Sequence, residues 1–155
     1  MLVYGIGNPG RQDDALGPLL AEEVRRHCAP EVVDVDANYQ LNVEDALLIS
    51  RYRVVIFVDA ADTDAADTDA LCQMRPVTEA PTGAFSTHAV LPGAIVSLAR
   101  ELYGAQPKVW LLTVRGYHWE PNKPLSGKAR VNFLQGRKIL LETIETMGGS
   151  EDGKH

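Results

Sequence analysis

The sequence has 155 residues, of which 45% are hydrophobic, and it carries a formal net charge of -6. This length and composition fit one compact domain with a single core. The acidic balance disfavours nucleic acid as a partner, because binding to a phosphate backbone needs a basic surface. Cys28 and Cys72 lie far apart and lack a metal-ligand or redox spacing, so we expect reduced thiols in a cytoplasmic protein.

The ends of the chain and its apolar runs further limit the domain organisation that the sequence allows. No apolar run approaches the roughly 20 residues that a membrane-spanning helix needs, and the N-terminus lacks the features of a secretory signal. We therefore expect no membrane partner. Residues 148–155 combine glycine with mixed charges, which predicts a flexible tail after a single domain over residues 1–147. The expected state is a monomer, because no heptad seam is present.

Strand-like and helix-like patterns alternate along the chain. Short apolar or β-branched runs predict five strands, at residues 2–7, 31–37, 54–58, 71–77 and 108–114, the fourth of them an edge strand. Apolar residues at helical spacing predict four helices, over residues 16–24, over 42–51, from 92 onward and over 126–147. The alternation predicts an α/β three-layer sandwich: a mostly parallel twisted sheet of about five strands with helices on both faces.

The predicted helices have apolar faces that should pack on the sheet. The face of the first helix consists of Leu16, Leu19, Leu20 and Val24. The face of the third, which starts at Pro92, consists of Ile95, Leu98 and Leu102. The face of the last consists of Ala129, Phe133, Leu140, Ile144 and Met147. Asn42 is the expected N-cap of the second helix.

The first loop carries an acidic pair where a phosphate-binding loop would avoid one. Residues 5–17 read GIGNPGRQDDALG, a glycine-rich turn that leads to Asp13 and Asp14 at the expected start of the first helix. Carboxylates in this place disfavour an anionic ligand. An ordinary structural alternative is that Asp13 caps the helix and Asp14 complements the helix dipole.

Asp59 follows the most strand-like run of the chain, residues 54–58. If the strand order is 2-1-3, Asp59 and Asp14 both lie at the topological switch point, where such sheets bind ligands. A carboxylate there is costly unless it is paired, hydrogen-bonded or bound to a metal. The other aspartates of the segment fit a solvated acidic loop: Asp62, Asp64, Asp67 and Asp69. A calcium loop is disfavoured, because the required glycine and late glutamate are missing.

His88 is the third candidate and stands shortly before the helix that starts at Pro92. A lone histidine is more often exposed or hydrogen-bonded than a ligand, so His88 gains weight only together with Asp14 and Asp59. Two carboxylates and an imidazole suit a borderline divalent ion, and three ligands leave positions open for water or substrate. The remaining histidines occupy less suitable places: His27, His118 and His155.

These segments resemble a known family, the endopeptidases that mature nickel-iron hydrogenases by trimming the large-subunit precursor. The matching segments occur in the family's order and span most of the chain. They are GIGNPGRQDDALG at 5–17, VVIFVDAAD at 54–62, STHAV at 86–90 and VRGYHWEPNKPLSGKA at 114–129. The first motif, with its paired acids, is the most specific.

The resemblance implies that Asp14, Asp59 and His88 bind a metal ion and form the catalytic centre. This ion is understood to be nickel already installed in the precursor, with other divalent metals able to substitute. The implied reaction hydrolyses one peptide bond and removes a C-terminal extension, so that nickel serves as a recognition element. A divalent ion polarises the scissile carbonyl or activates water, and a carboxylate can serve as general base.

The sequence departs from the family at two points. Ala15 stands where the family often has glycine, a change that a helix tolerates. Residues 59–70 read DAADTDAADTDA, and this repetition makes Asp62 the first substitute for Asp59 as a ligand.

Two other functions stay open. A metal-binding maturation chaperone would hold the precursor without cutting it. The opening turn also resembles that of peptidyl-tRNA hydrolase, whose Arg-His-Asn element is replaced here by Gln12-Asp13-Asp14. An acidic pair suits a tRNA phosphate poorly. No nucleophilic triad stands out, because Ser86 has no orienting acid beside it.

Overall fold

The computed structural model describes residues 1–62, 70–80 and 91–150, and all the predicted strands and helices are present in it. The elements are β1 (Leu2–Ile6), the 3-10 turn η1 (Gln12–Ala15), α1 (Leu16–His27), β2 (Asp34–Asn38), α2 (Asp45–Ile49), β3 (Val54–Asp62), β4 (Cys72–Pro76), α3 (Pro92–Tyr103), β5 (Lys108–Gly116) and α4 (Gly127–Ser150). Within these ranges, no helix combines the length and the apolarity needed to cross a membrane.

The sheet has five strands in the order β2-β1-β3-β5-β4. Its first four strands are mutually parallel, whereas β4 pairs with β5 in the antiparallel sense and forms an edge. The order β2-β1-β3 is the condition under which Asp14 and Asp59 were expected to lie at one switch point. From β1 the chain passes to β2 on one side and later to β3 on the other, so the switch point lies between β1 and β3.

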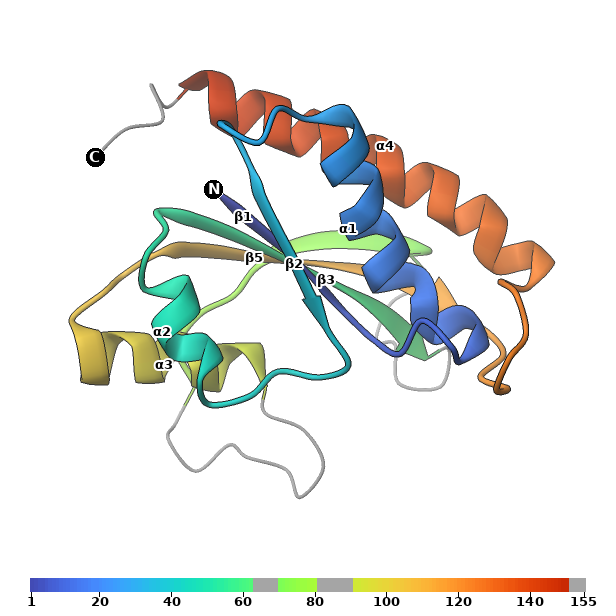
Figure 1. The fold of residues 1–155 in the computed structure, drawn as a ribbon, viewed down its shortest axis with the longest axis horizontal. Helices are drawn as coiled ribbons and strands as arrows, with labels where there is room; N and C mark the ends of the chain where they lie inside the picture. The colour runs from blue at the N-terminus through green and yellow to red at the C-terminus, as the bar shows by residue number, and fades with distance from the viewer. Residues whose placement is uncertain (63–69, 81–90, 151–155) are drawn as a thin grey trace.

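Helices cover both faces of the sheet, which confirms the three-layer sandwich (Figure 1). One face packs Ile56 and Val58 against α1 and α4, and the other packs Val55 and Phe57 against α2 and α3. Consecutive residues of β3 thus enter opposite cores. This explains why residues 54–58 are apolar without alternation, as expected for a central parallel strand.

Most of the predicted helix faces are correct, with two errors. Leu16, Leu20 and Val24 are fully buried, but Leu19 is 39% exposed. Leu102 is 61% exposed and lies in the last turn of α3, beyond the buried core of that helix. Helical spacing indicates a direction around the helix axis, but it does not indicate how wide or how long the covering surface is.

Two boundaries also differ from the prediction. Asn42 is not the N-cap of α2, since this short helix begins at Asp45. The carboxylate of Asp45 instead accepts a hydrogen bond from the backbone N–H of Asn42 at 2.8 Å. The closing helix continues past Met147 to Ser150. The rest of the predicted tail, residues 151–155, lies outside the described residues.

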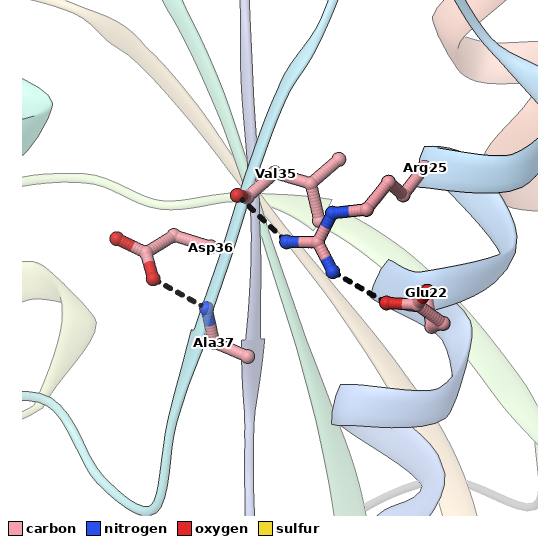
Figure 2. Close-up of polar contacts among 5 residues, drawn as sticks. All are labelled: Glu22, Arg25, Val35, Asp36 and Ala37. Atoms are coloured by element: carbon pink, nitrogen blue, oxygen red, sulfur yellow. Dashed lines mark hydrogen bonds and ion pairs between the residues drawn. The ribbon is translucent and has the colours of Figure 1, made fainter.

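β2 forms the other edge of the sheet, and side chains cover part of its backbone (Figure 2). Arg25 of α1 donates a hydrogen bond to the carbonyl of Val35 at 3.2 Å and also pairs with Glu22. The carboxylate of Asp36 accepts a hydrogen bond from the N–H of Ala37 at 2.8 Å. Covered backbone groups and charged side chains make this edge a poor template for another strand.

Candidate functional site

Asp59 lies within β3, level with the end of β1. The strand was predicted to stop at Val58 but continues to Asp62, so Asp59 is part of the strand rather than the first residue after it. Its neighbours in register are Ile6, the last residue of β1, and Thr113 of β5. Because β1 ends at this level, Asp59 borders the switch point between the two strands.

Asp14 is brought to the same place by close backbone contacts that only glycine permits. Gly7 has φ +141, and a Cβ atom on it would lie 2.0 Å from the carbonyl oxygen of Asp14. A Cβ atom on Gly17 would lie 2.2 Å from the carbonyl oxygen of Ile6 and 2.6 Å from that of Val58. The glycines of the first loop therefore draw η1 and the start of α1 onto the ends of β1 and β3.

The carboxylate of Asp14 is held by the backbone. It accepts a hydrogen bond from the N–H of Asn8 at 2.7 Å. The side chain is only partly buried, so it keeps access to solvent. This bond orients the Asp14 carboxylate within the first loop while leaving acceptor positions for another group.

Asp14 and Asp59 are electrostatically coupled. Burial raises the pKa of Asp59 from its ordinary 3.8 to about 7, and the negative charge of Asp14 contributes to this rise, while a hydrogen bond from the Ala60 N–H opposes it. Neither carboxylate forms an ion pair with another described residue. Two acids without a compensating cation among the described residues favour a proton or a metal ion.

Asp62, the sequence-based substitute for Asp59, has a different environment. It is exposed at the last position of β3, whereas Asp59 is partly buried. Residues three apart in a strand point to opposite faces of the sheet. Asp62 therefore cannot replace Asp59 beside Asp14 unless the strand shifts its register.

His88, the third predicted ligand, lies outside the described residues, as do Asp64, Asp67, Asp69 and Ser86. Across the parts of the chain that the structure describes, no group of three His, Cys, Asp or Glu side chains could hold a metal ion. The structure thus brings together two members of the predicted trio. The role of His88 stays a prediction.

Asp13 is an important residue of this region whose role the sequence did not reveal. It is fully buried, and its carboxylate accepts four hydrogen bonds, from the N–H groups of Tyr117, His118 and Ser126 and from the hydroxyl of Ser126, at 2.7 to 3.0 Å. Burial acts to raise the pKa of Asp13, but these donors hold it below its ordinary value. Asp13 does not cap α1, whose N-cap is Ala15 without a side-chain hydrogen bond.

Four further hydrogen bonds join the first loop to the segment after β5. They run from Arg11 Nε to the Trp119 carbonyl at 3.0 Å, from Glu120 N–H to Gln12 Oε1 at 3.2 Å, from Asn122 N–H to the Gly10 carbonyl at 2.8 Å and from Asp13 N–H to the His118 carbonyl at 3.0 Å. The two joined segments are the first and last of those that carried the family resemblance. The resemblance therefore contained a signal for this contact, although not for its geometry.

The fold and the acidic pair at its switch point define a class: the chain has the fold of the solved hydrogenase maturation proteases. It is similar to the hydrogenase maturating endopeptidase HybD from Escherichia coli, with a TM-score of 0.74 and 19% identity over 95% of this chain and 93% of that one. An endopeptidase from Escherichia coli gives a TM-score of 0.75 and 22% identity over the same shares of the two chains.

An archaeal structure has the same fold. The [NiFe] hydrogenase maturation protease HycI from Thermococcus kodakarensis KOD1 gives a TM-score of 0.69 and 20% identity over 93% of this chain and 91% of that one. No protein-family model matches the sequence, and no curated protein matches it significantly. The sequence-based prediction of this fold is confirmed by structures of low sequence identity.

Proposed function

We propose that this protein is an endopeptidase that removes the C-terminal extension of a nickel-iron hydrogenase large-subunit precursor after nickel insertion. The observation that carries the proposal is the coupled pair of Asp14 and Asp59 at the switch point. The fold supports it, because structures that share this fold over more than nine tenths of the chain are named as hydrogenase maturation proteases. An acidic pair in this place argues against a tRNA phosphate as substrate.

Nickel in this proposal belongs to the substrate, and Asp14 and Asp59 would bind it. Burial and, after it, the charge of Asp14 raise the pKa of Asp59, and a divalent ion would offset both effects, so the donor set fits a cation. His88 would be the third ligand, and it stands four residues before Pro92, the first residue of α3. α3 packs on the sheet face that also receives Val55 and Phe57, the face to which the alternation of β3 directs Asp59.

The residues of the chain would divide the work as follows. Asp14 is oriented by the Asn8 N–H, which presets its direction before substrate arrives. Asp59 has a pKa of about 7 in the metal-free protein, so it would serve as general base only while it is not bound to the metal. Asp13 positions the first loop against residues 117–126 and touches neither substrate nor metal.

The experiment that tests this function uses purified precursor with and without nickel. We expect cleavage of the nickel-loaded precursor and none of the nickel-free form. Equal cleavage of both forms would contradict nickel recognition. Stable binding of the loaded precursor without cleavage would support the alternative of a maturation chaperone. His88→Ala and wild-type protein, assayed side by side, test the third ligand.

The setting of the reaction follows from the same proposal. We expect the protein to act as a monomer in the cytoplasm. The thiols of Cys28 and Cys72 are both free, which suits a reducing compartment.

A further inference from the structure

Positive charge is concentrated in one part of this acidic chain. Residues 121–141 contain five of the 15 Lys and Arg residues and none of the 21 Asp and Glu residues. Three of the five cations have partners. Lys123 pairs with Glu120, Lys128 lies over the ring of Tyr117, and Arg137 contacts Glu23 and His27. The other two, Arg130 and Lys138, are exposed and form no ion pair with a described residue.

These two cations flank an exposed apolar pair on the first half of α4. Val131 and Leu134 are each 65% exposed. Positions 130, 131, 134 and 138 follow a helical spacing that places them on one face, which we call the outer α4 face. The opposite face carries the buried residues Ala129, Asn132, Gly136 and Leu140. No acidic residue occurs on α4 before Glu142, so the outer α4 face is basic around an apolar centre.

The outer α4 face starts close to the candidate site. α4 begins at Gly127, immediately after Ser126, which donates two hydrogen bonds to Asp13. Figure 1 shows the first turn of α4 at the same end of the molecule as the tip of β3, the strand that carries Asp59. The outer α4 face and the side chain of Asp59 lie on opposite sides of the sheet, so a protein held on this face would reach the candidate site around the end of the molecule where Ser126 meets the first loop.

We propose that the outer α4 face docks an acidic surface of the folded large-subunit precursor, apart from the extension that is cleaved. Arg130 and Lys138 attract and orient an acidic partner, and Val131 and Leu134 supply apolar area that becomes buried on contact. Residues 121–141 contribute no acid to this face, and Glu142, four residues after Lys138, borders its C-terminal end. This inference rests on the proposed function, because it names the docking surface for the same substrate.

The test compares two double charge reversals in precursor processing. Arg130→Glu with Lys138→Glu changes the outer α4 face. Arg51→Glu with Lys108→Glu makes the same change in net charge at exposed positions near the amino ends of β3 and β5, away from the site. Against nickel-loaded precursor, we expect the first variant to raise KM about tenfold with kcat unchanged and a weaker dependence of KM on salt. The control keeps the wild-type KM.

The apolar centre has its own test. Val131→Ser with Leu134→Ser should raise KM severalfold with kcat and the unfolding midpoint retained, since both side chains are exposed. An unchanged KM in this variant and in the charge reversal, while wild-type protein processes the precursor, overturns the docking inference alone. Failure of wild-type protein to process the precursor overturns the proposed function together with it.

Three further results would overturn the inference by assigning the outer α4 face to something else. The control reversal could raise KM as strongly as the first variant, which would show an effect of net charge only. Sedimentation could reveal a wild-type dimer that Val131→Ser with Leu134→Ser dissociates, which would make a second copy the occupant. Vesicles containing phosphatidylserine could bind wild-type protein and release the Arg130→Glu, Lys138→Glu variant, which would indicate a membrane surface.

Discussion

Asp13 and Asp59 are two carboxylates at one end of the sheet with opposite environments. Asp13 is fully buried, accepts four hydrogen bonds and has a lowered pKa. Burial and, after it, the negative charge of Asp14 raise the pKa of Asp59 to about 7. The Asp13 carboxylate uses its bonding capacity within the fold, so it stabilises structure. Asp59 keeps unused capacity and an unfavourable charge, so it can take up a proton or a metal ion.

The largest expected effect is a loss of activity on substitution of Asp14, the residue next to Asp13. Asp14→Asn should lower precursor processing by about 10³-fold or more, because the proposed nickel site loses a charged ligand. The amide oxygen can still accept the hydrogen bond from Asn8, so the unfolding free energy should change by less than about 1 kcal/mol. Gel assays of precursor cleavage and urea unfolding measure both quantities. Full activity in this variant would remove Asp14 from the site.

Asp13→Asn should show the reverse pattern, with stability as the primary loss. The amide group would turn an N–H donor toward donors of residues 117, 118 and 126, which leaves buried donors unpaired. We expect the unfolding free energy to fall by about 3 to 5 kcal/mol in urea denaturation. Ser126→Ala removes one of the four hydrogen bonds and should cost about 1 kcal/mol. A neutral Asp13→Asn would show that the joined loops do not depend on this carboxylate.

Asp59→Asn should change how the unfolding free energy of the metal-free protein depends on pH. Between pH 4 and 7 the folded wild-type protein keeps a proton on Asp59 that the unfolded chain has released, so this group lowers wild-type stability as pH rises. The variant lacks this loss. Its unfolding free energy minus that of wild type should therefore increase by about 1 to 3 kcal/mol from pH 4 to pH 8. A difference that does not vary with pH would refute the raised pKa.

Asp62→Asn is the matched control for Asp59→Asn and has the smallest expected effect. The side chain is exposed at the end of β3, where surface substitutions change stability by no more than about 0.5 kcal/mol. Nickel titration and precursor processing should both stay within about twofold of wild type, because Asp62 points to the other face of the strand. Loss of nickel binding in Asp62→Asn but not in Asp59→Asn would exchange the two assignments.

Much of the fold could be predicted because it depends on local patterns. The apolar run at residues 54–58 predicted a central strand, and the helical spacing of Leu16, Leu20 and Val24 predicted a buried face. The errors concern limits that local patterns do not contain. β3 continues to Asp62 because β5 supplies partners as far as Gly116, a contact between strands distant in sequence.

The candidate site likewise has features that the sequence predicted and features that it did not. The acidic pair after the glycine-rich turn and the acid after the central strand were visible in the sequence, because a carboxylate at the end of a buried strand is costly unless it is paired, hydrogen-bonded or bound to a metal. The role of Asp13 beside Asp14 was not visible, although the resemblance already implied Asp14 alone of the two as a ligand. They are adjacent residues of the same type, and a donor set more than 100 residues away decides between them.

The sequence by itself determined the layer architecture and the identity of the acids near the switch point. These follow from hydrophobic periodicity and from the cost of placing charge at the end of a buried strand. Only the tertiary structure decided which acid is saturated with hydrogen bonds, which one is left with a raised pKa and which face of α4 remains uncovered. These properties depend on which distant segments meet, and local sequence patterns do not specify the resulting distances.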